Sequence, residues 1–239
     1  MTHPTLQQSH GPQYTRILSI GAARGDRVVP NDDLVGPINS SDEWIRQRTG
    51  IITRTRASHD IGAVDLATEA SKEAIAKSGV DPKLIDAVIV ATISNPKQTP
   101  SVSAIVADRI GANPAAAYDI NAACAGFAYA VAQADALIRG GAAHYAVVVG
   151  AEKLSDIVDP TDRSISFLLG DGAGAAVIGP SDYPGVGPTI WGSDGSRADA
   201  VGMNATLNEF RDGQAPWPTL RQEGQTVFRW AVWEMAKVA

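Results

Sequence analysis

Two runs of β-branched residues constrain the fold more than any other feature of the sequence. Residues 86–93 (DAVIVATI) and 144–152 (HYAVVVGAE) have strand length and few polar interruptions. Strands of this kind are covered on both faces, as in a parallel sheet with helices on either side. Segments with a helical pattern, 101–110 and 124–141, lie between them. We therefore expect an α/β protein with a mainly parallel sheet.

The remaining elements of the first 180 residues continue this alternation. We expect strands at 16–23, 115–121 and 172–180, and helices at 40–50 and 62–78. The helix at 40–50 has marked ends, because Ser40 and Glu43 have the spacing of a capping box. Gly50 falls where a left-handed C-terminal cap would lie, and Gly79 ends the next helix in the same way.

A turn-rich stretch after Pro180 marks a boundary in the chain. Residues 1–15 are rich in Pro, Gln, Ser and His and are predicted to be a flexible arm. Residues 16–180 then form a first part, and 181–239 begin a second part. In the second part we expect a strand at 189–196 and an amphipathic helix at 225–239. No cap closes that helix, so we expect the second part to be incomplete.

Charge and cysteine content exclude several classes of function. The chain has 20 Lys+Arg against 26 Asp+Glu, a formal charge of −6, which argues against nucleic-acid or anionic-membrane partners. We find no signal peptide, and no apolar stretch reaches the ~18–20 residues that span a bilayer. The single cysteine, Cys124, excludes an intrachain disulfide and indicates a reducing, cytoplasmic setting. We expect no metal site and no phosphate-binding glycine loop.

Cys124 is the first candidate for chemistry. It follows the strand 115–121 and opens the helix 124–141, so its thiol would lie beside unpaired backbone N–H groups. The positive end of a helix dipole lowers the pKa of a thiol and makes it a nucleophile, and the Cys124 N–H could hold an oxyanion. A lone cysteine is also often a small buried apolar residue. The histidines offer no evident base, since they lie in the arm, in a turn or at a strand start: His3, His10, His59 and His144.

The helix at 40–50 carries a second candidate site. Trp44 and Arg48 are four residues apart and share a face, with Thr49 beside them. An indole and a guanidinium on one face can stack a base and pair with phosphate. A buried Trp beside a solvent-facing Arg is the structural alternative.

Arg163 closes the turn DPTDR at 159–163. Its guanidinium could bind a ligand, but Asp159 and Asp162 could equally be its ion-pair partners. None of these residues identifies a ligand alone.

Four motifs, in this order and spacing, resemble one family. SSDEWIRQRTGI, NAACAGFAYA, DPTDR and GDGAGAAV resemble β-ketoacyl-acyl-carrier-protein synthase III of the thiolase-like superfamily, from about Arg16 to the last residue. The resemblance implies a layered αβαβα fold of two similar halves, the first complete and the second only begun, and normally a homodimer. It implies a condensing enzyme that starts type II fatty acid synthesis. An acyl-CoA would acylate Cys124, and the acyl group would then condense with malonyl-acyl-carrier protein to give CO₂ and 3-oxoacyl-carrier protein.

The resemblance also assigns roles to single residues. Trp44 matches a tryptophan that stacks on the adenine of CoA, and Arg163 matches an arginine on the other side of that ring. The other CoA-binding positions are Arg48, Thr49, Gly224 and Phe228, and the acyl-pocket positions are Thr99, Leu154 and Leu169. Because Thr99 replaces a bulky phenylalanine of some members, we expect room for a longer or branched primer. Acyl-CoA is then a substrate, and no cofactor is expected.

The match leaves other functions open. The family's catalytic His and Asn lie in PHQAN-like and GNTS-like segments, which do not occur before Ala239. Losing one oxyanion donor costs about 10²–10³ in rate, so we expect very slow condensation from this chain alone. One alternative is a thiolase-like acyltransferase of secondary metabolism that passes the acyl group from Cys124 to oxygen or nitrogen. Another is a truncated, non-catalytic fragment that dimerises.

Overall fold

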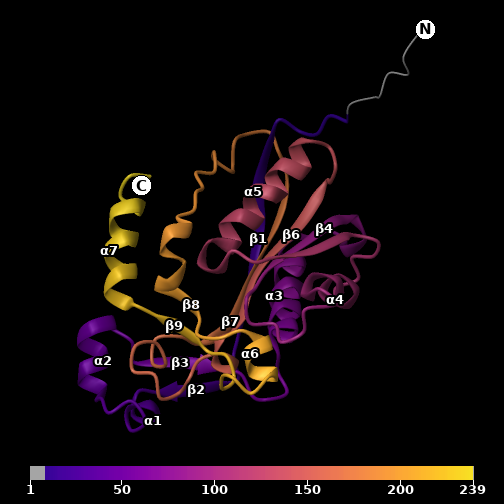
Figure 1. Ribbon diagram of the computed structural model, residues 1–239. Coiled ribbons are helices and arrows are strands. Elements are labelled where there is room, and N and C mark those ends of the chain that lie inside the picture. The colour runs from indigo at the N-terminus through magenta and orange to yellow at the C-terminus, as the bar shows by residue number, and fades with distance from the viewer. Residues whose placement is uncertain (1–8, 239) are drawn as a thin grey trace. The chain divides into compact units, whose positions relative to one another are not determined.

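The computed structural model describes residues 9–238, which form two compact units (Figure 1). Unit 1 comprises the described residues up to Arg24, together with His59–Glu152 and Gly172–Thr189. Unit 2 comprises Gly25–Ser58, Lys153–Asp171 and the residues from Ile190 onward. Each unit is assembled from separate stretches of chain. From the sequence we expected two consecutive parts that meet at residue 180, and that boundary stays a prediction.

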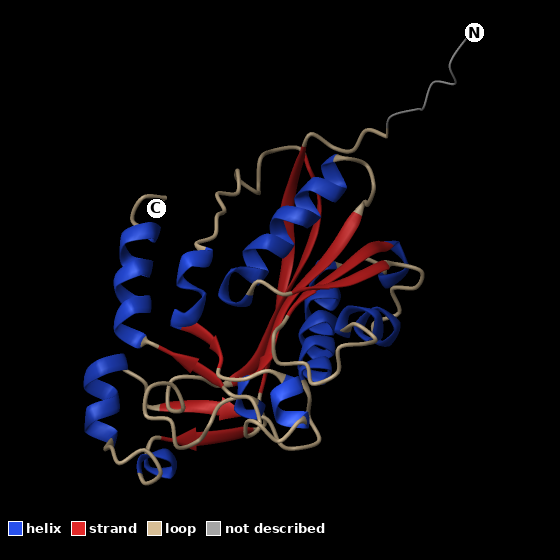
Figure 2. Ribbon diagram, viewed as in Figure 1, coloured by secondary structure: helices blue, strands red, loops and turns tan. Residues whose placement is uncertain are grey.

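Unit 1 is built on a five-stranded sheet in the order β1-β7-β6-β4-β5. Strands are drawn in red in Figure 2. Its strands are β1 (Tyr14–Arg24), β4 (Ile85–Ala91), β5 (Ala116–Ile120), β6 (Tyr145–Lys153) and β7 (Asp171–Ser181). Strands β4, β5 and β6 run parallel, whereas β1 pairs antiparallel with β7. The expected mainly parallel sheet is therefore right for the three strands at one side, and the β1–β7 pair makes the sheet mixed.

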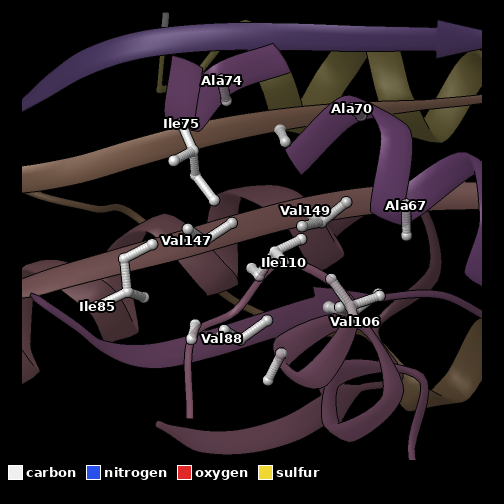
Figure 3. Packing of buried hydrophobic residues seen from close by; sticks show 14 of the residues in the cluster. Ala67, Ala70, Ala74, Ile75, Ile85, Val88, Val106, Ile110, Val147 and Val149 are labelled. Atoms are coloured by element: carbon white, nitrogen blue, oxygen red, sulfur yellow. The ribbon is translucent and has the colours of Figure 1, made fainter. Parts of the chain in front are cut away.

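Helices cover both faces of this sheet. They are α3 (Ala63–Ser78), α4 (Val102–Arg109) and α5 (Gly126–Arg139). Val88 of β4 and Val147 of β6 pack with α3 and α4 in one apolar cluster (Figure 3). The next residues along these strands, Ile89 and Val148, pack with α5 in a second cluster. All four side chains are fully buried, so the predicted burial of these strands on both faces is confirmed.

The N-terminal segment lies against the end of α5. The Ser9 hydroxyl donates to the Gly140 carbonyl (2.9 Å), and the Gly11 N–H donates to the Arg139 carbonyl (3.2 Å). These bonds satisfy carbonyls that a helix C-terminus otherwise leaves unpaired. Strand β1 then begins at Tyr14, inside the stretch expected to be a flexible arm. Residues 1–8 of that arm lie outside the described part of the chain.

Unit 2 contains two small antiparallel sheets and four helices. The sheets pair β2 (Arg27–Pro30) with β3 (Thr53–Arg56), and β8 (Val201–Met203) with β9 (Leu220–Gln222). The helices are α1 (Asp32–Val35), α2 (Asp42–Thr49), α6 (Leu207–Arg211) and α7 (Gly224–Met235). An apolar cluster of this unit is made by Val29, Leu34, Ile38, Ile45 and Phe167. Short 3-10 helices occur in both units as η1 (Pro82–Leu84), η2 (Ala123–Ala125), η3 (Leu154–Asp156) and η4 (Gly195–Ala200), the last with a kink at Arg197.

Helix α2 begins one residue later than the sequence pattern predicts. Its N-cap is Ser41, whose hydroxyl accepts from the Trp44 N–H at 3.1 Å. The expected capping box of Ser40 and Glu43 is therefore wrong, and the Ser40 hydroxyl is buried without a hydrogen-bond partner in the described chain. The C-terminal prediction is confirmed, because Gly50 adopts a φ of 71°.

The strand expected at 189–196 is wrong. Residues 189–194 have no regular secondary structure, and η4 follows from Gly195. The Asp194 carboxylate accepts from the Ser196 N–H (3.1 Å) and from Arg197 Nε (3.1 Å), which bends the chain into a turn. The pattern did not indicate β8 and β9, which have three residues each. The helix expected at 225–239 corresponds to α7, but α7 runs from Gly224 to Met235 and residues 236–238 form a turn. Ala239 lies outside the described residues.

A half-buried carboxylate joins the end of one strand of unit 1 to the loop that follows another. Glu152, near the end of β6, accepts from the N–H groups of Ile93 (3.0 Å) and Ser94 (3.1 Å). It also accepts from the hydroxyls of Ser94 and Thr92. Burial raises the pKa of Glu152, and the four donors only partly oppose that rise. The loop after β4 is thereby fixed to β6.

Glu152→Gln is expected to change how stability depends on pH. A carboxyl whose pKa is raised by folding stabilises the folded state while it is protonated, and this contribution is lost as pH rises through the folded pKa. Wild type should therefore lose unfolding free energy relative to the variant as pH rises through and above the ordinary titration range of a glutamate, about 4.3. Denaturant unfolding across that range measures the difference. Glu69→Gln is the control, because Glu69 is exposed. If the unfolding free energy of E152Q depends on pH in the same way as that of wild type, the assignment of a raised pKa to Glu152 is wrong.

Candidate functional site

Cys124 lies in the turn η2, between the end of β5 and the start of α5. The α-helix begins at Gly126, so Cys124 precedes the helix, and the expected helix over 124–141 is corrected to Gly126–Arg139. The cysteine is exposed. Its neighbour Ala123 has a φ of 43°, a left-handed conformation that residues with a side chain rarely adopt. Strained backbone of this kind is concentrated at functional sites.

Close packing fixes the chain just after the thiol. A Cβ on Gly126 would lie 2.7 Å from the Cβ of Ala91, the last residue of β4, so a larger residue does not fit there. The Phe127 ring lies against Gly150 of β6, 3.5 Å from where a Cβ would be. Helix α5 therefore starts in direct contact with two strands of the sheet, and this contact holds the Cys124 turn in place.

The three predicted acyl-pocket residues lie on separate segments. Thr99 is exposed in the loop after β4, the loop that Glu152 fixes in unit 1. Leu154 is the first residue of η3 and Leu169 lies just before β7, and both are half-buried in unit 2. Their assignment to an acyl pocket stays a prediction.

Trp44, Arg48 and Arg163 form what we call the Arg–Trp–Arg cluster of unit 2. The Arg48 Cζ atom lies 4.3 Å from the Trp44 ring centroid, and the Arg163 Cζ atom lies 4.7 Å from it. Each exposed contact of this kind is worth about 0.5–1 kcal/mol. The expectation that Trp44 and Arg48 share a face is confirmed. Because Trp44 is only half-buried, the alternative of a buried Trp beside a solvent-facing Arg does not hold.

The indole of the cluster is held from the core side by Phe167. The two rings meet edge to face, with centroids 5.4 Å apart and an interplanar angle of 80°. Ile45, the residue after Trp44, is fully buried in the same apolar cluster. The packing of α2 on this core therefore sets the direction of the indole.

Arg163 comes to the cluster from a turn that its aspartates shape. Asp159 accepts from the N–H and the hydroxyl of Thr161, and Asp162 accepts from the Ser164 N–H at 2.7 Å. In the described chain Arg163 forms no ion pair with Asp159 or Asp162, although the sequence left that pairing open. Its guanidinium lies on Trp44 instead.

The other predicted CoA-binding residues are placed differently. The Thr49 hydroxyl donates to the Ile45 carbonyl (2.8 Å) and accepts from the Ile51 N–H (3.1 Å), so it closes the end of α2. Gly224 begins α7, and Phe228 lies one turn further, with 71% of its surface exposed. Their contacts with a ligand stay predictions.

Three polar residues that support these sites were missed from the sequence: the buried Asn31 and Arg54, and the half-buried Glu152. Arg54 belongs to a strand in which every residue is polar (TRTR), so alternation gives no sign that it is buried. Asn31 begins a helix of four residues, too short for a periodic pattern. Only the position of Glu152, near the end of the mostly apolar strand β6, could have indicated it.

The Arg–Trp–Arg cluster suits an anionic ligand that carries an aromatic ring. A base that stacks on Trp44 has to insert between the ring and a guanidinium, or displace that guanidinium. Both guanidiniums can also pair with phosphate. Over residues 9–238 no three His, Cys, Asp or Glu side chains gather as metal ligands would. No helix within the same range has the length and apolar character needed to cross a membrane.

Comparison with known families places this chain among related proteins. Residues 118–195, which include Cys124 and Arg163, match the family model described as 3-oxoacyl-[acyl-carrier-protein (ACP)] synthase III. The β-ketoacyl-[acyl-carrier-protein] synthase III of Kocuria rhizophila is 52% identical, over 98% of this chain and 73% of that protein. The protein of the same name from Tropheryma whipplei is 54% identical, over 95% of this chain and 70% of its own length.

Solved structures agree with these relatives. The priming β-ketosynthase of a polyketide biosynthetic pathway is similar with a TM-score of 0.95 and 39% identity, over 99% of this chain and 71% of that one. The 3-oxoacyl-(acyl carrier protein) synthase III of Pseudomonas aeruginosa gives a TM-score of 0.81 and 35% identity, over 90% of this chain and 66% of that one. The fold is thus thiolase-like, as predicted. This chain belongs to the β-ketoacyl-acyl-carrier-protein synthase III family of acyl-transferring condensing enzymes.

Proposed function

We propose that the chain takes an acyl group from an acyl-CoA onto Cys124, as the first half-reaction of a synthase that starts type II fatty acid synthesis. The observation that carries the proposal is the Arg–Trp–Arg cluster, which offers an aromatic face and two cations to a nucleotide. CoA is a thioester carrier with such a nucleotide at its far end. The names of the relatives support an acyl-carrier protein as bearer of the second substrate.

The chemistry follows from a thiol and a thioester. The Cys124 thiolate attacks the carbonyl of the acyl-CoA, the oxyanion collapses, and CoA leaves as a thiolate that takes up a proton. Malonyl-acyl-carrier protein then loses CO₂, and its enolate carbon attacks the acyl-cysteine and releases the Cys124 thiolate. The nucleotide takes no part in the bonds that form and break, and its binding by the cluster supplies binding energy for the acylation step. In this scheme acyl-CoA is consumed as a substrate, and no cofactor takes part.

We further propose that the protein acts as a cytoplasmic homodimer. The lone cysteine supports a reducing compartment. The net charge of −6 gives no general attraction to nucleic acid or to anionic membranes. The family resemblance supports the homodimer and malonyl-acyl-carrier protein as partner.

A second function is favoured by one structural relative. The structure with a TM-score of 0.95 is a priming β-ketosynthase of polyketide biosynthesis, so the same cysteine chemistry could serve secondary metabolism in this chain. The two functions differ in the primer and in the carrier protein that receives it. Acyl transfer to a fatty acid carrier protein and to a polyketide carrier protein, measured side by side, separates them.

Intact mass after incubation with acetyl-CoA or isobutyryl-CoA tests the nucleophile. Wild type should gain the mass of one acyl group, and Cys124→Ala should gain none, because it lacks the attacking sulfur. The adduct should be released by neutral hydroxylamine, as a thioester is. An acyl adduct on Cys124→Ala, or none on wild type with either substrate, contradicts the role of Cys124.

Trp44→Ala tests the cluster as the nucleotide site. Stacking of a base on an aromatic ring is worth about 1–3 kcal/mol, so the rate constant for acylation by acyl-CoA should fall about tenfold. Acylation by the N-acetylcysteamine thioester of the same acyl group, which has no nucleotide, should not change. Trp217→Ala is the matched control, since Trp217 packs on Phe210 in the same unit. If the acylation rate constant falls equally with both substrates, Trp44 does not bind the nucleotide.

Thr99→Phe tests the size of the acyl pocket. If Thr99 lines it, the larger ring should slow acylation by isobutyryl-CoA and longer acyl-CoAs much more than acylation by acetyl-CoA. Gln98→Phe, beside it in the same exposed loop, is the control. A wild type that strongly prefers acetyl-CoA, or equal effects of T99F on all primers, would count against the assignment.

A further inference from the structure

A buried guanidinium in unit 2 joins segments that are far apart in the chain. Arg54, in β3, is 8% exposed. Its Nη2 atom donates to the Asn31 side-chain oxygen (2.6 Å) and to the Phe167 carbonyl (2.9 Å), and its Nη1 atom donates to the Val29 carbonyl (3.1 Å). Arg54 therefore reaches the segment that leads from Arg163 to Phe167.

Asn31 extends this hydrogen-bond chain to both ends of α2. Its side chain is almost fully buried, and its Nδ2 atom donates to the Asp42 carboxylate (2.7 Å) and to the Ile51 carbonyl (2.8 Å). Asp42 is the first residue of α2, and Ile51 follows the Gly50 cap. One amide group thus holds the start and the end of the helix that carries Trp44 and Arg48.

The two halves of the Arg–Trp–Arg cluster meet through this chain. On one side Arg54 holds the Phe167 carbonyl, in the run of turns that begins at Arg163. On the other side Asn31 holds α2 with Trp44. The Phe167 ring also touches the Trp44 ring, so the same residue is fixed by a polar bond at its backbone and by an aromatic contact at its side chain.

The energetics of Arg54 point to a geometric role. Burial lowers the pKa of Arg54, and its Nε atom is buried without a hydrogen-bond partner in the described chain. A buried charge with an unsatisfied donor is a poor means of stabilising a fold, since well-packed apolar residues commonly do better. What only a guanidinium supplies here is a rigid fork that donates to Val29, Asn31 and Phe167 at once.

We propose that Arg54 and Asn31 are positioning residues for nucleotide recognition, which set the spacing between Arg163 and Trp44. The proposal rests on the proposed function, because it takes the cluster to be the binding site for the nucleotide of acyl-CoA. Loss of either residue should affect only substrates that carry the nucleotide, because a displaced cluster binds the nucleotide more weakly and does not act on the thioester group. A merely structural role would instead affect every substrate alike.

The test uses Asn31→Ala and Arg54→Lys in the full chain. For each, the rate constant for Cys124 acylation is measured with acetyl-CoA or isobutyryl-CoA, whichever wild type uses faster, and with the N-acetylcysteamine thioester of the same acyl group. We expect the ratio of the two rate constants to fall at least about fivefold, with a raised KM for the acyl-CoA, because small misplacements of binding groups cost rate steeply. The melting temperature is recorded in parallel.

Thr55→Val is the matched control, since Thr55 neighbours Arg54 in β3 and bonds the Asp171 carbonyl instead of the chain to α2. It should leave the ratio unchanged. If Asn31→Ala does not fold, Asn31→Asp keeps the acceptor for Arg54, removes the donor to α2, and should lower the ratio as well. An unchanged ratio in R54K and in either Asn31 variant overturns the proposal. Trp44→Ala distinguishes failure of the positioning role from failure of the proposed nucleotide site. If W44A lowers the ratio and the Arg54 and Asn31 variants do not, only the positioning role is wrong. If W44A leaves the ratio unchanged, the cluster is not the nucleotide site.

Discussion

Because β4 and β6 are buried on both faces, unit 1 can expose polar chemistry only where these strands end. Alternate residues such as Val88 and Ile89 are committed to opposite apolar clusters, which leaves no face of the sheet for a polar site. The carboxyl ends of the parallel strands are different. There Glu152 accepts hydrogen bonds from the loop after β4, and the turn with Cys124 follows β5. The apolar core thus decides where the reactive thiol can be displayed.

Unit 2 is organised on another principle. Its apolar cluster is small, and much of the connection between its segments runs through buried polar groups such as Arg54 and Asn31. Buried hydrogen bonds are directional, so they fix relative positions more sharply than apolar contacts do. This suits a cluster in which two exposed cations must stay over one indole.

The sequence was most informative where one residue type has one structural use. The glycine cap of α2 was predicted because glycine adopts a positive φ at least cost, and the doubly buried strands were predicted because they have few polar positions. The cap at Ser41 was missed because Ser40, three residues before Glu43, has the spacing of a capping box, whereas Ser41 is followed three residues later by Trp44. The strand expected at 189–196 was wrong because the Asp194 carboxylate bends the chain into a turn within that stretch.

Contacts between distant segments were beyond the reach of the pattern. That Trp44 and Arg48 share a face follows from helical spacing alone, but the approach of Arg163 depends on a turn more than a hundred residues later. Arg54 and Arg56 occupy equivalent positions in TRTR, and nothing local tells which of them links Asn31 to Phe167. The family resemblance supplied the partnership of Trp44 and Arg163, which composition and periodicity could not.

The pairing of β1 with β7 also governs the order in which unit 1 can assemble. Strand β1 is at the edge of the sheet, and its neighbour is β7, so Tyr14 meets Ser181 only after the intervening chain exists. During synthesis β4, β5 and β6 can pack with their helices first, whereas β1 stays unpaired until β7 has been made. Closing so long a loop late is slow. Until β7 arrives, β1 has no partner strand on either side and is open to aggregation or to a chaperone. Pairing with β7 then leaves β1 at the edge of the sheet, with Ile17 and Ile20 still exposed.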